Sequence, residues 1–98
     1  MDYPDHHDKQ LIRAFNSLKT PLELQNFLRD LLTLSEIKEA ANRFRIATLL
    51  WQGEKSYQQI ARECNTSTTT VTRVNEWLNK RSEGGYRTAL SRLYPKKS

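Results

Sequence analysis

The order of apolar and polar residues has the period of α-helices along most of the chain. Apolar positions recur at spacings of three and four residues, as on one face of a helix, and we find none of the period-two alternation typical of half-buried strands. Six helical segments follow from this pattern and from the few prolines and glycines that interrupt it. They cover approximately residues 7–18, 21–31, 34–53, 57–64, 68–81 and 86–93. We therefore predict an all-α protein.

Polar capping residues precede four of these segments. Before the second segment, a threonine stands next to a proline, which is favourable at the first helical position because the amide there has no partner within the helix. The third and fourth segments begin with a capping box, in which two side chains satisfy free backbone amides reciprocally. The predicted caps are Thr20, Thr33 with Glu36, Ser56 with Gln59, and Ser67 or Thr66.

The third predicted helix has apolar residues around most of its circumference. A helix that is apolar on all sides is usually buried on all sides. A chain of 98 residues has little material with which to cover such a helix, so we expect a second subunit to cover it. The apolar residues are Ile37, Ala40, Ala41, Phe44, Ile46, Ala47, Leu49, Leu50 and Trp51.

Residues 56–80 meet the requirements of a helix-turn-helix, in which two short helices cross steeply and the second enters the DNA major groove. Ile60 and Ala61 place an apolar and a small residue where the second helix crosses the first. Asn65 follows four positions after the small residue and tolerates the left-handed backbone that the turn requires. Cys64 falls at the core-facing position of the turn, which favours a packing role over a redox role.

The second helix of this motif has one apolar face and one polar face. Val71, Val74 and Leu78 recur at helical spacing and face the first helix. The other face carries hydroxyls and an arginine, which offer donors, acceptors and methyl groups to base edges. Threonine is a mediocre helix former, so a threonine-rich helix that is merely exposed to solvent is the less favoured interpretation. The outward residues are Ser67, Thr68, Thr69, Thr72, Arg73, and Asn75 or Glu76.

The charge is divided unequally along the chain. Residues 1–54 contain eight acidic and seven basic side chains, whereas residues 55–98 contain three acidic and nine basic side chains. The first part is therefore nearly neutral, and the second part carries a net charge of +6. A strongly basic part is typical of a protein that binds a polyanion, although a basic surface can also serve solubility alone. We expect double-stranded DNA as the partner.

Composition and motifs exclude several classes of protein. A single cysteine cannot form an internal disulfide or a cysteine-based zinc site. No apolar run approaches the roughly 18 residues that a membrane span needs, and the first residues lack the pattern of a signal sequence. We expect no catalytic site, metal site or cofactor, because no arrangement of nucleophiles, paired carboxylates or glycine-rich loops has supporting context. His6 and His7, among nearby aspartates, indicate a frayed, solvated end.

Four segments carry a resemblance to a known family. They are Leu-Leu-Thr-Leu-Ser-Glu (31–36), Asn-Arg-Phe-Arg-Ile (42–46), Leu-Leu-Trp-Gln-Gly-Glu (49–54) and Val-Thr-Arg-Val-Asn (71–75). Over about residues 31–93 the chain resembles the Trp repressor family. The resemblance implies a six-helix fold, an intertwined homodimer, and repression at a near-palindromic operator read by two recognition helices about 34 Å apart. It also implies a cytoplasmic protein associated with a bacterial nucleoid. The length of 98 residues, in turn, predicts a single domain over residues 1–98.

The resemblance further implies a pocket for an effector, in which the family's co-repressor indole lies between two arginines. These arginines match Arg43 and Arg73, and a threonine near the ligand carboxylate matches Thr33. Two positions depart from the family, because Val74 replaces a glycine that gives the ligand room and Trp77 replaces a serine near the ligand amine. We expect the two larger side chains to fill the slot, so that free tryptophan is not bound. Trp77 is also placed to stack on Arg73, four residues earlier on the same helix face.

The DNA-reading residues depart from the family as well. A basic pair in the first motif helix corresponds to Gln58 and Ala61, and a bulky apolar start of the second helix corresponds to Thr68 and Thr69, so the operator is expected to differ. Base readout is expected from Ser67, Thr68, Thr69 and Thr72. Phosphate contacts are expected from Arg43, Arg45, Lys55, Ser56, Gln58 and Arg73. The alternative function is a helical protein–protein adaptor, whose basic residues 55–98 meet an acidic partner protein without reading DNA.

Overall fold

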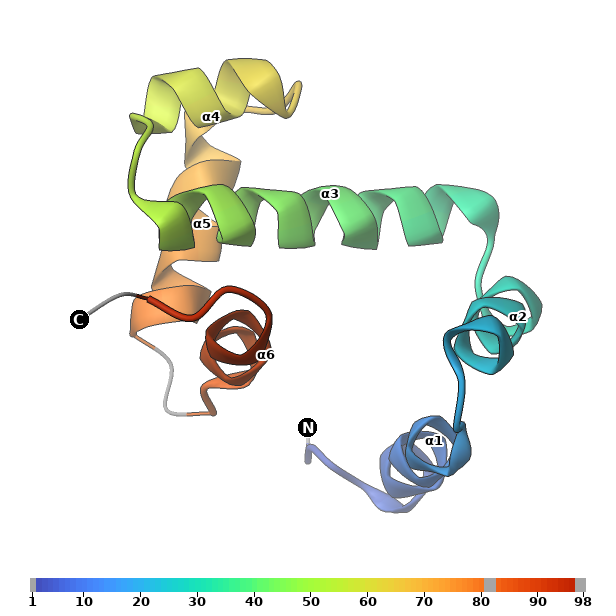
Figure 1. Cartoon of the computed structure of the whole chain (residues 1–98). Coiled ribbons are helices and arrows are strands. Elements are labelled where there is room, and N and C mark those ends of the chain that lie inside the picture. The colour runs from blue at the N-terminus through green and yellow to red at the C-terminus, as the bar shows by residue number, and fades with distance from the viewer. Residues whose placement is uncertain (1, 81–82, 97–98) are drawn as a thin grey trace. The chain divides into compact units, whose positions relative to one another are not determined.

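The computed structural model describes residues 2–80 and 83–96, and in these ranges it contains helices and no strand (Figure 1). The predicted all-α class is therefore confirmed. The predicted end of the fifth helix at Arg81 lies outside the described residues. No helix described is long and apolar enough to cross a membrane. The helices are α1 (His6–Ser17), α2 (Pro21–Leu31), α3 (Leu34–Gln52), α4 (Tyr57–Glu63), α5 (Thr68–Asn79) and α6 (Gly85–Leu93).

The chain divides into two compact units, residues 1–37 and residues 38–98. Each unit has its own packing and is described by itself. The single domain expected from the sequence stays a prediction.

The first helix begins with a capping box that the sequence analysis did not identify. The Asp8 amide donates to Oδ1 of Asp5 at 2.8 Å, and the Asp5 amide donates to Oδ2 of Asp8 at 2.9 Å. The interpretation of this end as frayed was wrong, because the two carboxylates satisfy amides that a helix start leaves free. α2 begins as predicted, with the hydroxyl of Thr20 accepting a hydrogen bond from the Glu23 amide at 3.1 Å.

Residues 2–37 contain no buried side chain. Phe15 of α1 and Phe27 of α2 meet edge to face, with ring centroids 5.3 Å apart. α2 and the first turn of α3 also line an open apolar hollow of about 340 Å³. This unit therefore presents apolar surface that it does not itself cover. The hollow is lined by Pro21, Leu24, Gln25, Leu28, Arg29, Leu34 and Ile37.

α3 begins at the predicted capping box. The Glu36 amide donates to Oγ1 of Thr33 at 3.1 Å, and the Thr33 amide donates to Oε1 of Glu36 at 2.9 Å. The hydrogen bond from the Thr33 amide lowers the pKa of the Glu36 carboxyl below its usual value, and the Thr33 hydroxyl has a smaller effect in the same direction. The carboxylate is thus held in the charged form that a helix start favours.

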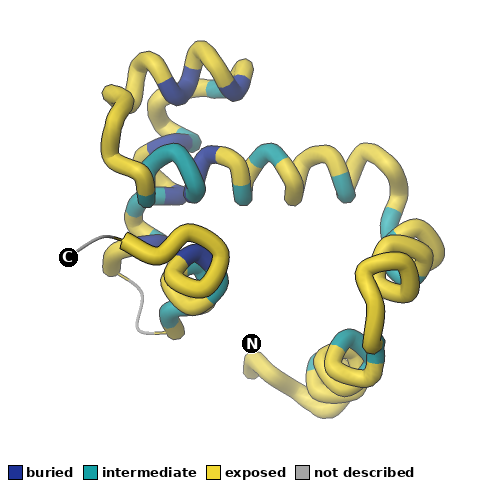
Figure 2. The backbone as a smooth tube through the Cα atoms, in the orientation of Figure 1, coloured by how far each residue is buried: buried dark blue, intermediate teal, exposed yellow. Residues whose placement is uncertain are grey.

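One chain by itself does not bury α3 on all sides, and the expected cover by a second subunit stays a prediction. Only Ile46 and Ala47 of this helix are buried, whereas Ala40 and Ala41 are exposed. Figure 2 shows the amino-terminal half of α3 in the colours of exposed and intermediate residues. The apolar circumference was a correct observation, but residues 38–98 of one chain cover only the carboxyl-terminal half of the helix.

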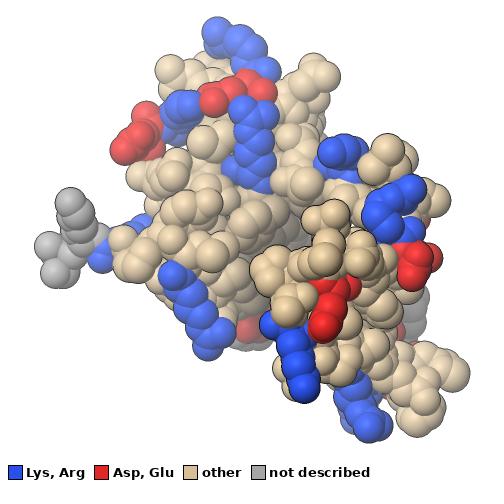
Figure 3. All heavy atoms as spheres, turned by 45° about the vertical axis from the view of Figure 1, so that its right-hand side comes forward, with Lys and Arg blue, Asp and Glu red and all other residues tan. Residues whose placement is uncertain are grey.

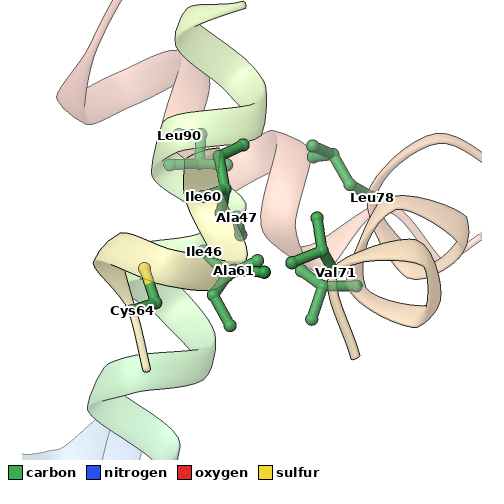
Figure 4. Packing of buried hydrophobic residues seen from close by; sticks show 9 residues of the cluster. Ile46, Ala47, Ile60, Ala61, Cys64, Val71, Leu78 and Leu90 are labelled. Atoms are coloured by element: carbon green, nitrogen blue, oxygen red, sulfur yellow. The ribbon is translucent and has the colours of Figure 1, made fainter. Parts of the chain in front are cut away.

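The core lies in the second unit, where α3, α4, α5 and α6 meet (Figure 4). Full burial of one valine, leucine or isoleucine side chain contributes roughly 1.5–3 kcal/mol, so this small cluster holds the four helices together. Phe44, Leu49, Leu50 and Trp51 of α3 are partly buried and pack against it. The buried residues are Ile46, Ala47, Ile60, Ala61, Cys64, Val71, Val74, Leu78 and Leu90.

Candidate nucleic-acid interface

The turn between α4 and α5 has the backbone that the sequence predicts for a helix-turn-helix. Asn65 has a φ of 53°, in the left-handed region that asparagine tolerates better than other non-glycine residues. The Thr66 amide donates to the carbonyl of Ala61 at 2.8 Å and closes the turn. α3 also supports it, because Nδ2 of Asn42 donates to the carbonyl of Cys64 at 3.0 Å. The predicted role of Asn65 is confirmed.

The Cys64 thiol is part of the packing of this turn. It is 3% exposed, and burial raises the pKa of the Cys64 thiol above its ordinary value. A buried thiol with a raised pKa carries little of the reactive thiolate. The predicted packing role is therefore confirmed.

α4 and α5 pack through the apolar residues that the spacing predicted. Ile60 and Ala61 of α4 are buried in the same cluster as Val71, Val74 and Leu78 of α5. α5 runs across the direction of α4 (Figure 1), which is the arrangement of a helix-turn-helix. The packing fixes which side of α5 turns inward and leaves the opposite side free.

The start of α5 is capped by Ser67, whose hydroxyl accepts a hydrogen bond from the Thr70 amide at 3.2 Å. The same hydroxyl lies 3.1 Å from Oγ1 of Thr70. Ser67 was expected to read bases, yet its hydroxyl is already engaged within the helix start. In this structure the residue positions α5 instead of presenting a free hydroxyl.

The outward side of α5 carries small hydroxyl side chains. Thr68, Thr69, Thr72 and Arg73 are all exposed. The Thr72 hydroxyl donates to the carbonyl of Thr68 at 2.9 Å, so its lone pairs and its methyl group remain available to an incoming ligand. An acceptor beside a methyl group is suited to the exocyclic amines and thymine methyls that line the DNA major groove.

Lys55 and Arg45, two of the residues expected to bind phosphate, both contact the carboxylate of Glu63. Lys55 precedes α4, and its Nζ lies 2.5 Å from Oε2 of Glu63. Arg45 of α3 places Nη2 3.6 Å from Oε1 of Glu63 and donates from Nη1 to the Glu63 carbonyl at 3.3 Å. The hydrogen bond from Lys55, assisted by the charge of Arg45, lowers the pKa of the Glu63 carboxyl. In the upper part of Figure 3, at the height of α4 in Figure 1, acidic side chains lie among basic ones.

Two further expected phosphate contacts, Ser56 and Gln58, lie at the start of α4. Ser56 caps α4 as predicted, accepting a hydrogen bond from the Gln59 amide at 3.1 Å while its own amide donates to Gln59 at 2.8 Å. Gln58 is exposed beside it. The two residues therefore remain at the surface, with the Ser56 hydroxyl engaged in the cap.

The expected effector pocket corresponds to a hollow of about 300 Å³ between α3 and α5. Arg43, Arg73 and Trp77 share its lining. The prediction that Trp77 stacks on Arg73 named the wrong arginine, because the structure places the guanidinium of Arg43 over the indole, 5.7 Å from the ring centroid. Val74 is fully buried in the core and does not line this hollow. Thr33 belongs to the other compact unit, where it caps α3.

A second hollow of about 510 Å³ shares Arg43 and Trp77 with the first and is also lined by Gly85 and Tyr86. Arg43 also forms an ion pair with Glu39 at 3.1 Å, one turn earlier on α3. The Arg43 side chain and the Trp77 indole therefore line both hollows and contact each other there.

Arg87 holds the carboxyl-terminal end of α5, a role that the sequence pattern did not predict. Its Nε donates to the Leu78 carbonyl at 3.2 Å, and its Nη2 donates to Oδ1 of Asn79 at 3.0 Å. The guanidinium lies 6.0 Å from the ring centroid of Trp51. A basic residue near carbonyls that end a helix is a common cap, but nothing in the sequence shows that α6 returns to this point.

Comparison with known proteins gives consistent results over nearly the whole chain. A family model described as Trp repressor protein matches residues 6–94. "Uncharacterized protein YerC" of Bacillus subtilis (strain 168) is 37% identical over 84 residues, which are 86% of this chain and 79% of that protein. The crystal structure of a TrpR-like protein from Eubacterium eligens ATCC 27750 is 33% identical, with a TM-score of 0.83 over 97% of this chain and 96% of the other. The family match thus starts well before residue 31, where the resemblance in sequence motifs begins.

Proposed function

Because the chain belongs to the Trp repressor family, we propose that it is a sequence-specific DNA-binding regulator that represses transcription as a homodimer. The observation that supports this most is the exposed threonine side of α5, opposite the buried Val71, Val74 and Leu78. In a helix-turn-helix this is the side that enters the major groove. Membership of the family indicates a DNA-binding regulator. The side chains of α5 are the reason for proposing that it recognises a specific base sequence.

Thr68, Thr69 and Thr72 read base edges in this proposal, and Ser67 fixes the start of their helix. Basic and polar side chains of α3, α4 and α5 bind the phosphates on either side of the groove, where they set register and affinity without reading sequence. The phosphate-binding residues are Arg43, Arg45, Lys55, Ser56, Gln58 and Arg73.

The proposal of a homodimer is supported by apolar surface that each compact unit leaves uncovered by its own residues. Leu22 and Leu34 are 61% and 54% exposed, and the hollow of residues 21–37 is almost entirely apolar. The open half of α3 adds to this surface. Exposed apolar surface of this extent is typical of a contact with another subunit, and we assign it to a second copy of the chain.

The two classes of DNA contact are distinguished by the variants Thr72→Ala and Lys55→Ala, measured on sites selected from a random duplex pool. Thr72→Ala is expected to reduce discrimination at one base pair of each half-site by about fivefold, because a base-edge contact is lost. Lys55→Ala is expected to weaken all sequences alike and to reduce the salt slope of the dimer by about 2, because each protomer loses one phosphate contact. Competition binding with single-base variants of the selected site measures both effects.

Lys9→Ala is the matched control for the lysine variant, because Lys9 is exposed on α1 and lies outside the proposed interface. It is expected to leave both affinity and preference unchanged within twofold. A wild-type protein that selects no sequence from the pool, or a Thr72→Ala variant with unaltered preference, contradicts the proposed readout.

Free tryptophan is expected not to bind at micromolar concentrations and not to alter DNA affinity. Trp77 lies in the lining of the candidate effector hollow, and its indole already receives the Arg43 guanidinium. A ligand indole would have to displace this contact. Titration calorimetry with L-tryptophan measures the binding directly. Saturable heat with a micromolar dissociation constant would show that the hollow still accepts the family's co-repressor.

A further inference from the structure

The two cations that converge on Glu63 form an anion-binding arrangement already occupied by a carboxylate of the same chain. Lys55 comes from the segment before α4 and Arg45 from α3, so two separate elements supply the positive charges. Their contacts are to different oxygens, Lys55 to Oε2 and Arg45 to Oε1. A carboxylate that bridges an ammonium and a guanidinium in this way uses the same donors that a phosphodiester would use.

We propose that Lys55 and Arg45 form a phosphodiester site that Glu63 occupies in the free protein and must release when DNA binds. This inference rests on the proposed function, which makes the two cations phosphate contacts. Glu63 thereby lowers the affinity for DNA, because each bound protomer exchanges two internal ion pairs for contacts with the phosphate backbone.

The exposure of the three side chains permits this exchange. The side chains of Arg45, Lys55 and Glu63 are 51%, 37% and 37% exposed, so each can change partner without opening the core. Arg45 has a second anchor, because it also donates to the backbone carbonyl of Glu63. That bond does not depend on the carboxylate, and it keeps the guanidinium near the end of α4 after the exchange.

The test is a mutant cycle on DNA of random sequence, because phosphate contacts do not depend on sequence. Glu63→Gln is expected to tighten binding by about three- to tenfold at low salt, as estimated from two exposed ion pairs. In a Lys55→Gln, Arg45→Gln background, Glu63→Gln is expected to change the affinity by less than about twofold, since no cation remains to be released. Fluorescence anisotropy at several salt concentrations gives each value, and the gain is expected to shrink as salt rises.

Glu54→Gln is the control, since it removes the same charge from a neighbouring exposed position and no described ion pair involves Glu54. It is expected to tighten binding by less than half as much as Glu63→Gln, and thermal unfolding of each variant verifies that it is folded. Weaker binding by Glu63→Gln would show that the carboxylate orients the cations instead of competing with phosphate. Equal tightening in both backgrounds, or no binding of random DNA by any variant, would also overturn the proposal. Sequence selection by the wild type tests the proposed function separately.

Discussion

Raising the salt concentration from about 50 to 200 mM is expected to weaken operator binding by about three to five orders of magnitude. Each protomer contributes four basic side chains to the proposed phosphate contacts, and the homodimer contributes two such sets. The four are Arg43, Arg45, Lys55 and Arg73, all of them exposed. Neutralising that many phosphates releases condensed counterions, and the entropy of their release falls as the bulk salt concentration rises.

Anisotropy titrations at five or six salt concentrations measure this effect as the slope of log K against log[salt]. A slope of about −7 is expected for the dimer, and loss of one basic residue from each protomer reduces it by about 2. The Lys9→Ala control is expected to retain the wild-type slope. A wild-type slope between 0 and about −2 would contradict the proposed set of contacts and would favour a function in which the basic surface meets another protein.

Ile60→Ala is expected to lower the free energy of unfolding by about 2–5 kcal/mol. The Ile60 side chain is completely buried in the cluster that joins α4 to α3, α5 and α6. Removing three of its carbons leaves a cavity that the short helix α4 cannot close without losing its contact with α5. Because small domains are stable by only about 5–15 kcal/mol, the variant is expected to bind DNA weakly at 37 °C for lack of folded protein.

Urea denaturation followed by circular dichroism measures this loss. The control is Leu93→Ala on α6, where the leucine is 60% exposed and the expected change is about 0.5 kcal/mol or less. Equal stabilities of wild type and Ile60→Ala would mean that α4 is not held to α5 through this residue. The helix-turn-helix would then lack the packing that directs the threonine side of α5 outward.

The parts of the fold that were predicted correctly depend on short-range chemistry. The capping boxes at Thr33 and Ser56 join residues three positions apart, and the left-handed turn at Asn65 is a property of a single residue. The inward face of α5 follows from helical periodicity alone. The cap formed by Asp5 and Asp8 is equally local, but this end was interpreted as frayed because its aspartates lie among histidines near the amino terminus.

The parts of the site that were not predicted depend on contacts between residues far apart in the sequence. The ion pair of Arg45 with Glu63 spans 18 positions, and the hydrogen bond of Asn42 with Cys64 spans 22. Helical spacing identifies only neighbours on the same helix, which is why Trp77 was assigned a partner on α5. Its partner Arg43 comes from α3, and this arrangement requires the crossing of two helices that spacing alone does not give.

The exposed amino-terminal half of α3 could not be assigned a covering partner from the sequence. An apolar circumference indicates that a helix is to be covered, but it does not say which chain covers it. Residues 38–98 bury Ile46 and Ala47 and leave Ala40 and Ala41 exposed. In the proposed function a second copy of the chain supplies the missing cover.

The most direct measurement of the central claim is a titration of isotopically labelled protein with its selected operator, followed through the backbone amide resonances. The largest shifts are expected on residues 67–73 at the start of α5, with smaller shifts at residues 55–58 beside the phosphates. Shifts confined to residues 2–37 or to α6, with the amides of α5 unchanged, would mean that α5 does not enter the DNA.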